Sequence, residues 1–75
     1  MIRAYVLLTV ESGEEDNVLN ELAKIKGVEK SYFSWGVYDI ISIVKVESLE
    51  LLKTLSTNKI RSINQVKSTL TLIIK

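Results

Sequence analysis

Residues 32–44 read YFSWGVYDIISIV, an aromatic run that leads through a glycine into a run rich in β-branched residues. A glycine between two strand-like segments predicts a hairpin turn at Gly36, because glycine adopts positive φ angles without steric cost. Asp39 opens the second strand, a position where aspartate is unusual because its short side chain competes for backbone hydrogen bonds. Its carboxylate therefore either accepts backbone N–H groups in the turn, which composition alone favours, or binds the ammonium group of a ligand.

The segments around this hairpin alternate between strand and helix patterns. Apolar residues at every second position predict strands at residues 2–10, 28–35, 38–46 and 66–75. The helical spacing of Val18, Leu22 and Ile25 predicts a first helix, whose last turn contains Lys24 and Lys26. Residues at its two ends support this assignment, since a Ser12–Glu15 capping box would start the helix and Gly27 would end it.

A second helix is expected between the third and fourth strands. Ser48 can cap its start, and Leu51, Leu52 and Leu55 form its apolar stripe. The pattern weakens near Thr57, because serine, threonine and asparagine side chains compete with the helical backbone. We therefore expect a helix that weakens or breaks near this point and resumes to about residue 63.

The resulting order, strand–helix–strand–strand–helix–strand, predicts a single α+β domain over residues 1–75 with a ferredoxin-like βαββαβ fold. Two helices would cover one face of a four-stranded antiparallel sheet. The best-filled face is assigned to the helices: Ala4, Val6, Leu8, Val10, Ile40, Val44, Val46, Leu70, Leu72 and Ile74. The opposite face is then also apolar, with Tyr5, Leu7, Ile41, Ile43 and Ile73 among Thr9 and Thr71. An open apolar face marks an interface, so the fold is expected to dimerise through the sheet.

The amino-acid composition excludes several kinds of functional site. The chain of 75 residues has no cysteine and no histidine, which excludes disulfides, thiolate or imidazole metal sites and an acyl-transfer triad. No phosphate-binding glycine motif is present, and neither a metal nor a cofactor is expected. Ten basic and nine acidic residues give a net charge of +1, which does not favour binding to the phosphate backbone of nucleic acid. Without a membrane-length apolar run or a signal peptide, a cytoplasmic protein is expected.

At this point several segments together resemble a known family, the ligand-binding domain of Lrp/AsnC-type transcription regulators, also called the RAM (regulation of amino acid metabolism) domain. The matching segments are residues 4–10 (AYVLLTV), 27–28 (GV), 36–41 (GVYDII), 60–63 (IRSI) and 66–74 (VKSTLTLII). The most specific of them is Gly36-x-Tyr38-Asp39 followed by aliphatic residues. Family members normally carry an N-terminal helix-turn-helix domain, so this chain resembles a stand-alone form without direct nucleic-acid binding.

The resemblance implies a non-enzymatic homo-oligomer, in which dimers assemble into a ring, often octameric, and bind an amino-acid effector between dimers. A full-length Lrp/AsnC-type regulator is the implied partner. Asp39 would meet the effector's ammonium group, and backbone N–H groups near Gly36 or nearby hydroxyls would meet its carboxylate. The implied ligand-binding residues are Trp35, Gly36, Tyr38, Asp39, Ser68, Thr69 and Thr71.

Two other hypotheses belong to different classes. The first is an oligomerisation domain that forms the same assembly without any effector. The second is a small cofactor-independent oxygenase or isomerase on a dimeric ferredoxin-like sheet, against which the absence of histidine argues.

Overall fold

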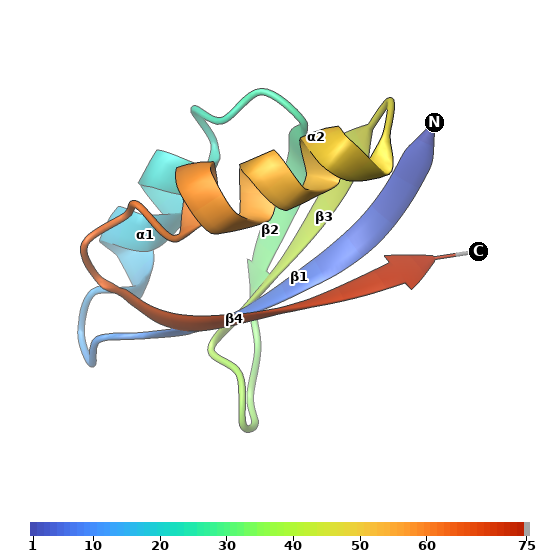
Figure 1. Ribbon diagram of the computed structural model, residues 1–75. Helices are drawn as coiled ribbons and strands as arrows, with labels where there is room; N and C mark the ends of the chain where they lie inside the picture. Colours follow the sequence, from blue (N-terminus) through green and yellow to red (C-terminus); the bar gives the residue numbers. More distant parts are fainter. Residues whose placement is uncertain (75) are drawn as a thin grey trace.

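The structure is a computed structural model that describes residues 1–74. Its elements, in chain order, are β1 (Ile2–Val10), α1 (Glu15–Leu22), β2 (Val28–Phe33), β3 (Ile40–Val46), α2 (Leu49–Thr54), the π-helical segment η1 (Leu55–Ile60) and β4 (Val66–Ile74). All strand pairs are antiparallel, and the sheet order is β2-β3-β1-β4. The helix α1 and the continuous helical stretch of α2 and η1 cover the same face of the sheet (Figure 1). The predicted α+β, ferredoxin-like architecture is confirmed, while Lys75, the predicted last strand residue, lies outside the described residues.

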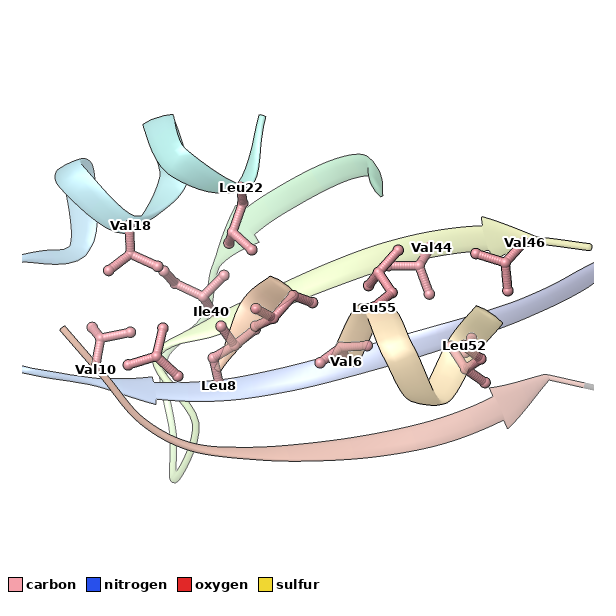
Figure 2. Close-up of a cluster of buried hydrophobic side chains, with 13 residues drawn as sticks. Val6, Leu8, Val10, Val18, Leu22, Ile40, Val44, Val46, Leu52 and Leu55 are labelled. Atoms are coloured by element: carbon pink, nitrogen blue, oxygen red, sulfur yellow. The ribbon is translucent and has the colours of Figure 1, made fainter. Parts of the chain in front are cut away.

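The core lies between the sheet and the helices. Figure 2 shows Val18 and Leu22 of α1 at one end of the buried cluster, and Leu52 and Leu55 at the other. The sheet contributes alternate residues of its two central strands: Ala4, Val6, Leu8 and Val10 from β1, with Ile40, Val44 and Val46 from β3. These assignments from the sequence are confirmed. The buried polar residue Ser42 is satisfied, because its hydroxyl shares a 2.8 Å hydrogen bond with that of Ser31.

The first helix is shorter than predicted at both ends. It begins at Glu15 with Glu14 as its N-cap and no side-chain cap, so the predicted Ser12 capping box is wrong. Gly13, with a φ of 85°, turns the chain before the helix instead. The helix ends at Leu22, and its last turn contains no basic residue. Gly27 does adopt a left-handed φ of 103°, but in the turn before β2 rather than at the helix end.

The second helix starts as predicted and changes form as its sequence suggests. The Ser48 hydroxyl accepts a 3.1 Å hydrogen bond from the Leu51 N–H, which confirms the cap. From Leu55 the α-helix continues as the π-helical segment η1. The hydroxyls of Ser56 and Thr57 both donate to the carbonyl oxygen of Lys53, the local competition expected of such residues. The segment ends at Ile60, before the predicted residue 63.

The face assignment of β4 is reversed relative to the prediction. Tyr5 pairs with Leu72 and Leu7 with Leu70, and directly paired residues of an antiparallel ladder project to the same face. Leu70, Leu72 and Ile74 therefore lie on the open face of the sheet, and Thr69, Thr71 and Ile73 lie on the helix face. Both sets contain apolar residues, so periodicity alone left the phase of this strand undetermined. The ladder to β1, with its irregularity between Thr9 and Val10, fixes it.

Candidate functional site

The loop between β2 and β3 projects beyond the end of the sheet (Figure 1). It spans residues 34–39, because β2 already ends at Phe33 and β3 begins only at Ile40. The Ser34 N–H donates a 2.9 Å hydrogen bond to the Asp39 carbonyl and closes the loop. The predicted positive φ at Gly36 is wrong, since Gly13 and Gly27 are the residues with positive φ in residues 1–74. Trp35 at the tip is fully exposed, and Val37 is 84% exposed.

Asp39 ties this loop to the end of β1. Its Oδ2 accepts a 2.9 Å hydrogen bond from the Val10 N–H, and its own N–H donates to the Leu8 carbonyl at 2.8 Å. The Val10 N–H lies at the irregularity of the β1–β4 ladder, so the carboxylate satisfies a donor that the bulge leaves without a regular ladder partner. Within the described part of the chain, Oδ1 makes no hydrogen bond. Asp39 thus accepts a backbone N–H group, which is one of its two predicted roles. Its Oδ1 remains accessible to the second role, the binding of a ligand's ammonium group.

A shallow hollow of about 500 Å³ lies beside this loop. We call it the hairpin hollow; its lining residues are Glu15, Phe33, Ser34, Trp35, Gly36 and Asp39. It combines two carboxylates with two aromatic rings, a combination that favours a cationic group such as an ammonium. Three of the predicted site residues thus lie together, whereas the half-buried Tyr38 does not line the hollow. Sequence reasoning missed Glu15 because its place before an apolar stripe indicated a helix cap.

The three predicted hydroxyl residues of β4 do not form one cluster within the chain. Ser68 lies on the open face, where its hydroxyl shares a 2.6 Å hydrogen bond with that of Thr9. Thr69 and Thr71 lie on the helix face, and Thr71 lines a separate hollow between β4 and α2. One chain therefore brings together Trp35, Gly36 and Asp39 of the predicted site, and leaves Tyr38 and the three β4 residues outside the hairpin hollow.

The open face of the sheet carries apolar side chains from all four strands. Its strand register creates two rows that cross all four strands, namely Tyr32–Ile41–Leu7–Leu70 and Lys30–Ile43–Tyr5–Leu72. The outer members remain accessible, with Tyr32 49%, Leu70 41% and Leu72 47% exposed. The face is more apolar than predicted, because β4 presents Leu70, Leu72 and Ile74 to it. A continuous apolar face of this kind is typical of a protein–protein interface.

Two other kinds of site find no support in residues 1–74. No group of three or more acidic residues is arranged to hold a metal ion there. No helix of this part of the chain is long and apolar enough to cross a membrane.

Comparisons with known proteins agree on one family. The family model of the Lrp/AsnC ligand binding domain matches residues 3–75. The crystal structure of FFRP-DM1 is 31% identical, with full coverage of both chains and a TM-score of 0.95. The hypothetical protein PHS023 from Pyrococcus horikoshii is also 31% identical over all of this chain and 90% of its own, with a TM-score of 0.92. AsnC of E. coli is 27% identical over 97% of this chain but only 50% of its own, with a TM-score of 0.91. The comparison with curated proteins finds no match.

Proposed function

Because the chain belongs to the Lrp/AsnC ligand-binding domain family, we propose that it is a transcription-regulation module that binds an amino-acid effector and couples it to assembly. The observation that carries this proposal is the family match over residues 3–75, on a fold that leaves one sheet face apolar and open. In this proposal, the effector lies at a contact between dimers. Its binding changes the assembly of this chain or of an Lrp/AsnC-type regulator.

Dimerisation through the sheet would bury the open face. A two-fold axis through the sheet would bring the apolar rows of two copies together, and Arg3, Lys30 and Lys45 would lie among the more polar parts of the contact. If each copy buries a few hundred Å² of apolar surface, this contact contributes several kcal/mol at about 25 cal/mol per Å². This term is comparable to the whole stability of a small domain, so the assembled form would be the stable one.

The hairpin hollow supplies half of an amino-acid site. Asp39 Oδ1 and the Glu15 carboxylate would receive the ammonium group of the effector, and Trp35 would contact its side chain. Among residues 1–74, no basic side chain lines this hollow, so the effector's carboxylate needs donors from elsewhere. Backbone N–H groups near Gly36 and hydroxyls of a neighbouring copy, including Ser68 on the open face, are the candidates. A site that is incomplete in one chain would couple effector binding to assembly.

Calorimetry with a panel of amino acids tests the effector. We expect heat with one or a few of them, and a loss of that heat in Asp39→Asn, which removes the charge but keeps an oxygen for the Val10 N–H. Asp16→Asn is the matched control, because Asp16 is an exposed first-turn residue of α1 outside the hollow. Loss of binding in the control, or full binding in Asp39→Asn, would contradict the assignment of the site.

A second function is favoured by the hydrogen bond between Asp39 and the Val10 N–H. This hydrogen bond gives the carboxylate a structural role that needs no ligand. In this second function, the chain is an oligomerisation module without an effector. An intact oligomer that gives no heat with any amino acid would favour this alternative.

Direct DNA binding is not part of the proposal. The net charge of +1 supports action through a partner regulator rather than through the phosphate backbone of DNA. Tight, specific binding of DNA by this chain alone in a gel-shift experiment would contradict this part of the proposal.

A further inference from the structure

A second hollow, of about 420 Å³, lies on the helix side of the molecule. Four parts of the chain surround it: Met1 before β1, the turn before β2, the end of β3, and the helical segments α2 and η1. It shares no lining residue with the hairpin hollow. Because three of its residues are lysines, we call it the lysine hollow.

Its floor is apolar. Val46 and Leu55 are 9% and 4% exposed and belong to the buried core, so the hollow opens directly onto the core. Leu51, one turn earlier on α2, also lines the hollow and is 49% exposed. Figure 2 shows Leu55 and Val46 at the same end of the buried cluster. A ligand with an alkyl tail would gain free energy by covering these side chains.

Its rim is positively charged. Lys26 comes from the turn before β2 and Lys59 from η1, whereas the Lys45 side chain lies beside Arg3 on the open face of the sheet. Among residues 1–74, Glu47 is the acidic residue that lines the hollow, so its lining side chains have a net charge of +1 (Lys26 and Lys59 minus Glu47). The salt bridge found in residues 1–74 joins Lys24 to Glu21, so no carboxylate there lies within 4.0 Å of the Lys26 and Lys59 ammonium groups. The hairpin hollow, with Glu15 and Asp39, has the opposite charge.

The backbone around the lysine hollow is held in place. The Lys45 N–H donates a 2.8 Å hydrogen bond to the Gly27 carbonyl, which joins the turn to the end of β3. Gly27 has a φ of 103°, and a Cβ atom there would lie 2.7 Å from Leu55 Cδ1. Only glycine therefore allows the turn to approach the helix so closely. Leu55 and Lys59 both lie on η1, and π-helical segments are frequent at functional sites.

We propose that the lysine hollow binds a small anionic amphiphile, that is, an alkyl chain with a carboxylate or phosphate head group. The tail would cover Leu51 and Leu55, and the head group would lie between the lysine ammonium groups. The hollow has the volume of a small-molecule pocket, and its net positive charge favours an anion over a cation. This site is separate from the effector site and does not depend on it.

The test is an NMR titration of the ¹⁵N-labelled full chain with octanoate, octyl phosphate, octylammonium and acetate. We expect octanoate or octyl phosphate to shift the amide signals of residues 26–27, 45–47 and 51–59, and the tighter of the two identifies the head group. Octylammonium has the same tail with the opposite charge, and acetate has the same charge without the tail. Neither should bind measurably. Equal binding of octylammonium, equal binding of acetate, or no shift with either anion would overturn the proposal.

Variants at the rim test the lysines directly. Because exposed ion pairs are weak, each of Lys26→Gln and Lys59→Gln should weaken binding about threefold, and the double variant about tenfold. Lys53→Gln is the matched control, because this exposed lysine of α2 faces a different hollow. Its affinity should not change. Equal weakening in the control would show that general surface charge, and not this hollow, holds the anion, and would overturn the assignment.

Discussion

The Leu72→Lys substitution tests whether the open sheet face is a dimer interface. Leu72 lies on the edge strand β4, pairs with Tyr5 and remains 47% exposed in the single chain. The substitution keeps a long side chain on the strand and places a charge within the proposed contact. The fold of the single chain should be retained, because this side chain lies outside the core.

The expected loss follows from the exposed fraction. Complete burial of a leucine side chain contributes about 2 kcal/mol, so burial of the exposed half contributes about 1 kcal/mol per copy. A two-fold dimer contains the substitution twice, which gives about 2 kcal/mol, or roughly a thirtyfold higher dissociation constant. Holding a lysine ammonium in an apolar contact adds a desolvation cost, so thirtyfold is a lower limit.

Sedimentation equilibrium over a range of concentrations measures this change. The wild-type chain should sediment as a multiple of 8.5 kDa, and the variant should approach 8.5 kDa at concentrations where the wild type remains assembled. Leu49→Lys is the control, since Leu49 is 54% exposed but lies on α2, on the other side of the molecule. An unchanged assembly in Leu72→Lys, or equal dissociation in Leu49→Lys, would refute the assignment of the interface.

Three further predictions concern stability, and chemical denaturation measures each of them. Gly27→Ala should lower the free energy of unfolding by about 1–3 kcal/mol, because it combines a positive φ with a steric clash. Gly36→Ala should change it by less than about 0.5 kcal/mol, and equal effects would contradict the assignment of a positive φ to Gly27 alone of these two glycines. Ser48→Ala should cost about 1 kcal/mol through loss of the helix cap, and Ser12→Ala, which removes no cap, should cost clearly less. Asp39→Ala should cost about 1–3 kcal/mol by leaving a backbone N–H unpaired, and Asp39→Asn should cost less because an acceptor oxygen remains. A neutral Asp39→Ala would show that the hydrogen bond contributes nothing.

The sequence predicts the element order because each element has a strong local pattern. The buried residues of β1 and β3 alternate without interruption, and Ser48 stands directly before a leucine-rich run. Local patterns were less informative where two signals competed. Ser12 and Glu15 have capping-box spacing, but Gly13 takes a positive φ and delays the helix until Glu15. Gly36 stands where a glycine turn is expected, yet a six-residue loop makes a positive φ unnecessary there.

The sequence did not correctly predict which residues of β4 face the helices. The prediction gave the more apolar set of residues to the helices, on the assumption that the best-filled face is the buried one. The structure gives Leu70 and Leu72 to the open face, and the helices cover Thr69 and Thr71 instead. That arrangement is favourable for a strand whose apolar residues become buried only on assembly. The sequence pattern therefore predicted an open apolar face opposite the helices, but it assigned the wrong residues of β4 to that face.

The candidate sites depend on contacts between distant residues. Asp39 was singled out from its unusual place in a strand, but its partner, the Val10 N–H, comes from another strand and could not be identified by spacing. Glu15 joins the hairpin hollow only because α1 packs beside the β2–β3 loop. The lysine hollow takes its two lysine side chains from the turn before β2 and from η1, so no local motif predicts it.

The proposed function requires an assembly whose state responds to an amino acid. The most direct test is the light-scattering mass of the wild-type chain in solution, with and without a mixture of the common amino acids. The proposal predicts a mass of at least twice 8.5 kDa that shifts when the mixture is added, and subdivision of the mixture would identify the effector. An 8.5 kDa monomer would contradict the proposed interface, and an oligomer indifferent to every amino acid would contradict the proposed sensing function.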